Sequence, residues 1–315
     1  MIPKEHLGRA NGMYGLIEVG PQVVAPILAG ALLPLIKLTG ILFIDVVTFL
    51  TAIAVLLIIH VPQPERSALA SEINEESMLK QAGYGFRYIF ARPSLLGLQL
   101  IFFTGNLFSG IGFAVFTPMV LLRTGNNELL LGSALSAGAI AAVIGGVVMS
   151  AWGGFKRRVH GVLLGWLFSG LGFSIMGFAG GLPIWIIGSV ASSILVSLIN
   201  GSNQAIWQSK VPPDIQGRVF SSRTLIAWLT NPISPVIGGV LADYVLEPAA
   251  RAGTGLPAAL AWLVGTGPGS GMGALIVVCG LLCAIVGLAG YFSTSIREAE
   301  SILPDHDLPA ALEPA

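Results

Sequence analysis

The chain consists mostly of long apolar runs, each about as long as a helix that crosses a membrane. Such a helix needs roughly 20 consecutive, mostly apolar residues. Short polar segments separate the runs, so the pattern predicts an all-α, polytopic membrane helix bundle. Eight runs reach this length, and they cover residues 14–36, 39–61, 95–121, 129–152, 159–180, 182–208, 219–246 and 271–293.

The composition supports this prediction. Of the 315 residues, 54% are hydrophobic and 10% are charged, whereas soluble domains carry about 25% charged residues. The net charge is zero, which leaves no basic surface for nucleic acid. The four histidines are scattered, and no cluster of His, Asp or Ser marks one membrane face. We therefore expect no metal site, no cofactor and no enzymatic activity.

Lysine and arginine are distributed unevenly between the connecting segments. Cytoplasmic segments of membrane proteins carry an excess of these residues. Thirteen of the 16, with Arg223 counted among them, fall in one alternating set of segments, and Lys37, Arg123 and Arg251 fall in the other. The sequence therefore predicts a multi-pass protein of the cytoplasmic membrane with both termini inside the cell.

The segment 62–94 is the longest predicted cytoplasmic connection. Apolar residues in its second part recur at helical spacing, which predicts a short amphipathic helix on the inner leaflet. A solvated linker is the alternative. The residues with this spacing are Met78, Leu79, Ala82, Phe86, Ile89 and Phe90.

A repeat with an offset of 209 residues joins two distant parts of the chain. The motif P-x-[D/E]-x-x-G-R covers residues 3–9 and 212–218. In both copies a basic turn precedes a helix that a proline kinks, so we expect gating or structural roles. Two unrelated segments of similar composition are the alternative. The corresponding pairs are Gly8 and Gly217, Arg9 and Arg218, Pro26 and Pro235, and Gly30 and Gly239.

The two copies differ in what precedes them. Four apolar runs lie between residues 95 and 208, directly before the second copy, and none lies before the first. Equivalent halves would give two sets of six helices, an arrangement of parallel repeats. We therefore expect a chain that lacks four leading helices and does not transport by itself. Its parts would be the last two helices of an N-terminal half (1–61), a cytoplasmic central loop (62–94), a six-helix C-terminal half (95–293) and a cytoplasmic tail (294–315).

Two carboxylates, Glu18 and Asp45, lie within apolar runs. A charge at the centre of a membrane costs at least about 2.5 kcal/mol, and burial raises a carboxyl pKa towards neutrality. Both residues are therefore candidates for proton coupling. Hydrogen bonding to a neighbouring helix end is the alternative.

The run 182–208 carries polar residues on one helical face. Asn200, Asn203, Gln204, Trp207 and Gln208 recur at i, i+3, i+4, i+7 and i+8, which places them on one side of a helix. Unpaired amides that face lipid are costly, so this side should face protein or a water-filled cavity. The first four are candidates for binding an amphiphilic ligand. Hydrogen bonding between helices is the alternative, and we favour it for Gln208, which lies nearest the cytoplasm.

Several short motifs occur in a fixed order along the chain: Arg9-Ala10-Asn11-Gly12, Ala25-Pro26 with Ala29-Gly30, Ile44-Asp45-Val46-Val47-Thr48-Phe49, Gln208-Ser209-Lys210-Val211-Pro212-Pro213 and Gly217-Arg218-Val219-Phe220. Together they resemble the macrolide-efflux and siderophore-exporter branch of the major facilitator superfamily, over nearly the whole chain. The resemblance implies the major facilitator fold, with the eight runs as helices five to twelve of twelve. It also implies alternating access driven by an ion gradient, usually of protons.

The resemblance further implies export of an amphiphilic small molecule through a central cavity. The run 182–208 would line this cavity together with the run 95–121, which contributes Asn106. The loop with Arg157 and Arg158 resembles a basic gate loop of the family but lacks its usual acid. The implied partners are a small-molecule substrate, protons and the lipid bilayer, and we expect a monomer. An importer of the same fold and an inactive fragment are the alternatives.

Overall fold

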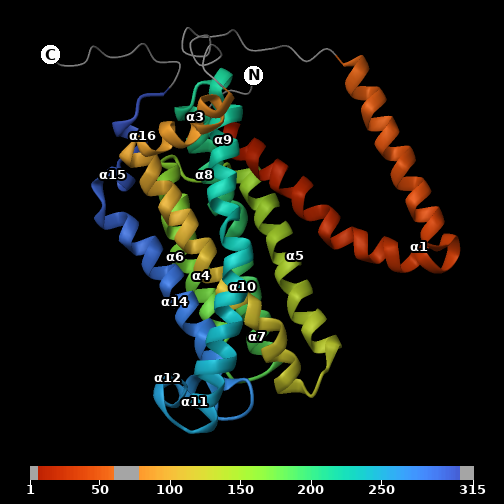
Figure 1. Cartoon of the computed structure of the whole chain (residues 1–315), viewed down its shortest axis with the longest axis vertical. Helices are drawn as coiled ribbons and strands as arrows, with labels where there is room; N and C mark the ends of the chain where they lie inside the picture. Colours follow the sequence, from red (N-terminus) through yellow and green to blue (C-terminus); the bar gives the residue numbers. More distant parts are fainter. Residues whose placement is uncertain (1–5, 60–77, 306–315) are drawn as a thin grey trace.

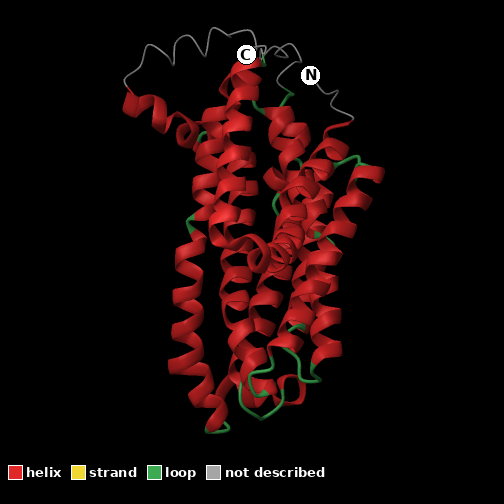
Figure 2. Ribbon diagram, turned by 90° about the vertical axis from the view of Figure 1, so that its right-hand side faces the viewer, coloured by secondary structure: helices red, strands yellow, loops and turns green. Residues whose placement is uncertain are grey.

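The structure, a computed structural model, describes residues 6–59 and 78–305, and within them it describes the helices but not the side chains of residues 14–35, 38 and 78–82. All regular elements in the described part are helices, and they form an elongated bundle (Figures 1 and 2). Seven helical stretches in this part are long and apolar enough to cross a membrane. The prediction of an all-α, polytopic membrane bundle is therefore confirmed.

Helix α1, Leu7–Ile58, covers the predicted run 14–36 and residues 39–58 of the predicted run 39–61. The helix is interrupted at Lys37, whose φ of 57° and ψ of 178° lie outside the helical region. The chain then turns back, and Thr39–Ile58 runs apart from the bundle with none of its residues buried (Figure 1). Lys37 was predicted as the connection between the two runs. The run 14–36 is helical, but its side chains lie outside those described and it is not among the seven stretches.

The six predicted runs between residues 95 and 293 form the bundle itself. Within it, α14 packs along α4 and α6, α5 packs along α7, and α10 packs along α4, while α1 packs against α5 and α8. The helices are α4 Pro93–Thr124, α5 Glu128–Trp152, α6 Arg158–Ile175, α7 Leu182–Ser193, α8 Val196–Lys210, α9 Pro213–Trp228, α10 Thr230–Leu241, the π-helical turn η2 Ala242–Leu246, α11 Glu247–Arg251, α12 Gly255–Ala259, α13 Ala261–Val264 and α14 Ser270–Phe292.

The bundle has two distinct ends. Helix α1 begins at the same end at which α15 (Thr294–Arg297) and α16 (Ala299–Ile302) lie, and α11 and α12 lie at the other end (Figure 1). We call the first the basic end, because it carries Arg9, Arg157 and Lys210. The location of both terminal helices at one end is what an even number of spans requires.

Two of the predicted runs contain a break between successive helices. The run 219–246 changes from α9 to α10 at Leu229. Pro232 has no N–H with which to bond the carbonyl of Trp228 four residues earlier, so the hydrogen-bonded series is interrupted there. The run 182–208 changes from α7 to α8 after Ser193, and Gly145 of α5 lies against this break. A Cβ on Gly145 would lie 2.1 Å from the carbonyl oxygen of Ile194.

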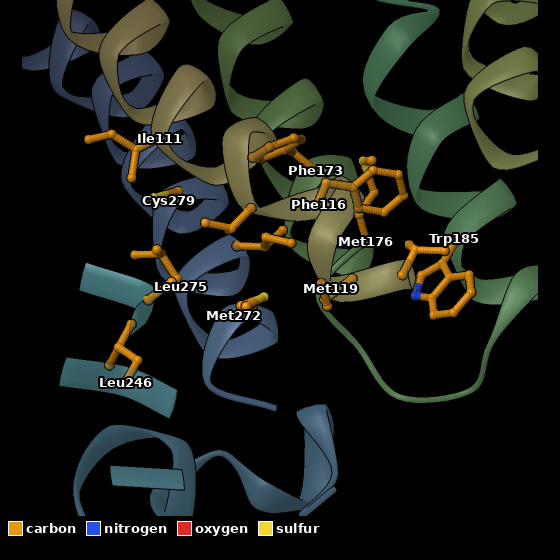
Figure 3. Packing of buried hydrophobic residues seen from close by; sticks show 14 of the residues in the cluster. Ile111, Phe116, Met119, Phe173, Met176, Trp185, Leu246, Met272, Leu275 and Cys279 are labelled. Atoms are coloured by element: carbon orange, nitrogen blue, oxygen red, sulfur yellow. The ribbon is translucent and has the colours of Figure 1, made fainter. Parts of the chain in front are cut away.

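The largest core cluster joins α4, α5, α6, α7, η2 and α14 near the end opposite the basic end (Figure 3). Phe116 and Met119 of α4 are fully buried there, and Trp185 of α7 is 2% exposed. Cys279 of α14 belongs to this cluster, and Cys283, one turn further along, belongs to a second cluster towards the basic end. Each cysteine is 2% exposed.

Helix α3, Met78–Phe90, is the helix predicted for the second part of the segment 62–94. We expected it to lie on the inner leaflet, but it packs against α9. Tyr88 and Ile89 are buried in a cluster with Trp207, Ile215 and Val219. Of the apolar residues predicted for this helix, Ile89 is buried and Phe90 is 61% exposed, and the side chains of Met78, Leu79 and Ala82 lie outside those described. The C-terminal half of α3 is therefore packed on the bundle, and its position relative to the inner leaflet stays a prediction.

Candidate functional site

A cavity of about 650 Å³ lies towards the basic end of the bundle. Helices α1, α4, α5, α8 and α9 all contribute to its wall. Most of its polar lining consists of carboxamide side chains. The lining residues are Leu7, Ala10, Asn11, Gln99, Phe102, Asn106, Ala142, Val196, Ser197, Asn200, Gly201, Asn203, Gln204, Gln208, Arg223, Thr224, Ala227 and Trp228.

Four of the five predicted substrate-binding residues lie in this wall. Asn200, Asn203 and Gln204 come from α8 and Asn106 from α4. The fifth, Trp207, is fully buried and does not line the cavity. Its indole Nε1 donates to Oδ1 of Asn203 at 3.1 Å, so it holds that amide in place from behind. The structure thus places Trp207 as a positioning residue.

Three further amides of the cavity wall were not predicted as binding residues. Asn11 of α1 donates through Nδ2 to Oε1 of Gln208 on α8, at 2.9 Å. This bond joins α1 to α8, which is the kind of hydrogen bond between helices that we favoured for Gln208. Gln208 also lines the cavity. Gln99 of α4 is 2% exposed and donates through Nε2 to the carbonyl oxygen of Arg223 at 3.1 Å. These bonds fix the amides that surround the cavity.

Arg223 is the main correction to the sequence prediction. It was counted among the basic residues of the connecting segments, but it lies ten residues into α9 and lines the cavity. Its Nη2 donates to Oε1 of Gln204 at 2.7 Å, and its guanidinium lies over the ring of Trp207, 5.3 Å from the centroid. The sequence held the relevant signal, because Arg223 falls inside the predicted run 219–246 and an arginine within a span is a functional candidate.

Neither candidate proton-coupling residue is among the described residues that line the cavity. The side chain of Glu18 lies outside the described residues. Asp45 is on the exposed part of α1, where its backbone carbonyl accepts a bond from Thr48 at 2.9 Å. The structure therefore does not bring Asp45 to the cavity wall.

The two copies of the repeat have different surroundings. Gly8 lies against the C-terminal cap of α5, and a Cβ there would lie 2.0 Å from the carbonyl oxygen of Gly153. Around Gly217, at the corresponding place in α9, no described atom lies within 4 Å of such a Cβ. Arg9 also contacts Gly153. The first motif therefore seats α1 on α5.

The remaining motif residues are placed as follows. Pro235 lies inside α10, and a Cβ on Gly239 would meet no described atom within 4 Å. The side chains of Pro26 and Gly30 lie outside those described. Arg218 lies in the first two turns of α9 at the basic end.

The loop with Arg157 and Arg158 obtains its acid from the C-terminal tail. Nη2 of Arg157 lies 3.0 Å from Oε2 of Glu298, and Arg158 donates to the carbonyl of Ala205 at 3.4 Å. Glu300 accepts a bond from the backbone N–H of Val159 at 2.9 Å. The local sequence lacks a carboxylate, and the fold supplies two from residues about 140 positions later.

Lys210 at the end of α8 holds the same tail. Its side chain is 4% exposed, and Nζ lies 2.9 Å from Oδ1 of Asp305. Nζ also donates to the carbonyls of Glu300 and Leu303. The tail is thus fastened to both α6 and α8 at the basic end.

Attachment of the tail is expected to weaken in acid. A hydrogen bond from Ser301 and the nearby Arg157 guanidinium lower the pKa of Glu298. A carboxylate with a lowered pKa stabilises the folded state above its unfolded pKa of about 4.3, and this contribution is lost as the pH falls through the folded value. We expect protection of residues 294–302 from hydrogen exchange to fall by at most about fivefold below pH 4, since the pair is exposed.

The control for this measurement is Glu298→Gln, which removes the titrating group. At pH 7, residues 294–302 of this variant should be protected from hydrogen exchange only as much as the same residues of the wild type are below pH 4. A wild-type tail whose protection is equal at pH 7 and below pH 4 would contradict the role of the ion pair.

Comparison with known proteins agrees with this architecture. The model of the Major Facilitator Superfamily matches residues 1–158. Macrolide efflux protein A of Streptococcus pyogenes is 22% identical over 250 residues, which are 78% of this chain and 60% of that protein. Macrolide efflux protein A of Enterococcus faecalis is 23% identical over 238 residues, 74% of this chain and 72% of that protein.

The multidrug efflux pump Tap of Mycolicibacterium fortuitum is 23% identical over 242 residues, 75% of this chain and 57% of that protein. The chain thus spans about 60% of the length of the streptococcal relative. No solved structure matches the chain. The helical bundle and the match of the family model over half of the sequence lead to one conclusion: the chain belongs to the Major Facilitator Superfamily.

Proposed function

We propose that the protein is a secondary transporter that exports an amphiphilic small molecule, and that the amide-lined cavity is its substrate site. The cavity carries the proposal. It lies within a membrane-spanning bundle and combines carboxamides with the apolar surfaces of Phe102 and Trp228. Sites for small molecules are concave and mostly apolar, with a few polar groups that fix orientation. The efflux activities in the names of its relatives point to the same substrate class.

The cavity also suits a transport cycle with alternating access. It lies where α1 meets α8 and α9. Among the described side chains, Asn11 of α1 and Gln208 of α8 are joined there by one amide–amide hydrogen bond. Such bonds between membrane helices contribute only about 0.6–2 kcal/mol. A seam of this kind can open and close without disrupting the core of the bundle.

Transport should respond to an imposed pH gradient. The proposal includes proton antiport through Glu18, with Asp45 as the second candidate. The full-length parent of this chain, in which the four expected leading helices are present, should accumulate in liposomes at least one of three radiolabelled amphiphiles, namely a macrolide, a fatty acid and a neutral steroid, several-fold above empty liposomes. Glu18→Gln should abolish the response to the gradient, because the amide cannot bind and release the coupled proton.

The matched control is Glu128→Gln, which alters an exposed glutamate in the first turn of α5. It should leave accumulation unchanged. If the Glu18→Gln variant still accumulates the compound in response to the pH gradient, Glu18 is ruled out as the proton site. Equal accumulation in empty liposomes and in liposomes that contain the full-length parent, for all three compounds, would contradict the proposed function.

A further inference from the structure

Arg223 has fewer partners than its chemistry demands. A guanidinium carries five N–H donors and no acceptor. Nη2 bonds to Gln204, whereas Nη1 is shielded from solvent and has no hydrogen-bond partner among the described residues. Cζ of Arg223 lies over the rings of Trp207 and Phe220, 5.3 and 5.4 Å from their centroids. These contacts supply no acceptor for Nη1, so part of the guanidinium is left unmatched.

No described acid compensates this charge. Arg223 is the only charged side chain among the described lining residues of the cavity. It lies ten residues from the start of α9, or about 15 Å along the helix axis, and inside the predicted run 219–246. A charge within a membrane span is costly unless it is paired. The described part of the cavity therefore presents a net positive charge surrounded by neutral amides.

We propose that the cavity binds anionic amphiphiles, and that Arg223 binds the oxyanion of their head group. The planar fork of arginine matches a carboxylate, sulfonate or phosphate. Since Oε1 of Gln204 already accepts from Arg223, its amide nitrogen is left to donate to the same anion. The apolar body of the ligand would lie along Phe102, Ala227 and Trp228. The proposal rests on the cavity being the substrate site, but binding does not require transport.

Two dyes with the same skeleton test this charge preference. 1-Anilinonaphthalene-8-sulfonate (ANS) carries a sulfonate, and N-phenyl-1-naphthylamine (NPN) does not. Their affinities for the full chain in zwitterionic lipid nanodiscs are measured by energy transfer from tryptophan. The ratio of ANS to NPN affinity should fall at least tenfold in Arg223→Gln and should recover in part in Arg223→Lys. Arg297→Gln, an exposed tail arginine, should change the ratio less than threefold.

Two results would overturn the proposal. One is an affinity ratio that is the same in wild type and Arg223→Gln. The other is equal loss of ANS and NPN binding in Arg223→Gln that Arg223→Lys restores for both dyes, which would indicate a structural role. The thermal unfolding midpoint of each variant shows whether it is folded. A selective, Arg223-dependent loss of ANS binding without pH-driven transport would support this inference and count against the proposed function alone.

The anion could be a soluble amphiphile or the head group of a membrane lipid. Displacement of ANS by dodecanoate, but not by dodecanol, would support the first source. Displacement by phosphatidylglycerol added to the nanodiscs would support the second. If neither dodecanoate nor phosphatidylglycerol displaces ANS, the assignment of ANS to the Arg223 site is overturned.

Discussion

Arg123→Met is expected to lower the free energy of unfolding by about 3 kcal/mol, because several buried carbonyls lose a charged donor at once. Arg123 lies at the end of α4. Nη1 donates to the carbonyls of Gly177 and Phe178 at 3.4 and 3.0 Å. Nη2 donates to those of Val264 and Gly269 at 2.9 and 3.1 Å. One side chain thus joins the segment after α6, the end of α13 and the start of α14.

The measurement is thermal unfolding in detergent, followed by circular dichroism. A loss of this size should lower the midpoint by roughly 6–12 °C. Arg123→Lys should give an intermediate loss, since the ammonium keeps the charge but has no fork. Arg251→Met removes an exposed arginine at the same end of the bundle and should change the midpoint little. Equal midpoints for Arg123→Met and Arg251→Met would show that the four bonds contribute nothing net.

Gly8→Ala should detach the start of α1 from α5, at a cost of about 2 kcal/mol. The added Cβ would lie 2.0 Å from the carbonyl oxygen and 3.0 Å from the carbonyl carbon of Gly153. Backbone atoms cannot move aside as a flexible side chain would. Gly153 itself has a φ of 86° as the cap of α5, a conformation that glycine adopts without strain. Hydrogen exchange of residues 7–13 should therefore become at least tenfold faster.

The repeat supplies a matched control for this prediction. Gly217→Ala makes the same change at the corresponding position of α9, where no described atom lies within 4 Å of the new Cβ. Alanine is about 1 kcal/mol better than glycine in a helix, so this variant should be as stable as the wild type or slightly more stable. Faster exchange at residues 7–13 in Gly217→Ala, or none in Gly8→Ala, would contradict the described seating of α1.

The hydrophobic pattern predicted the helices well because lipid imposes a length and a polarity on each span. The runs from 95 to 293 correspond to α4–α14, and Lys37 separates two helical parts of α1 as expected. The pattern does not encode interruptions within a span. Breaks at Leu229 and after Ser193 depend on local proline chemistry and on close contact with Gly145, and only the first has a signal in the local sequence.

The candidate site was predicted in part, and the misses have physical causes. Helical spacing put Asn200, Asn203 and Gln204 on one face, which the cavity wall confirms as a shared face. Spacing gives an angle around the helix but no depth of burial, so Trp207 was grouped with them although it is fully buried. Arg223 was counted with the connecting segments because its charge alone was taken to mark the end of a membrane span.

Long-range pairings were beyond the reach of the local sequence. The loop residue Arg157 pairs with Glu298, which lies 141 positions later, and Glu300 bonds to Val159 over the same separation. Each of these contacts depends on α14 returning the chain to the basic end. A motif that looks incomplete in sequence can therefore be completed by a distant segment.

The burial of both native thiols has a practical consequence for studying motion. Cys279 and Cys283 are each 2% exposed and lie in separate core clusters, so a membrane-impermeant maleimide should leave them unmodified. A single cysteine introduced on each side of the seam between α1 and α8 could then carry a spin label in an otherwise native protein. Changes in the distance between two such labels would report directly whether the seam opens when a ligand enters.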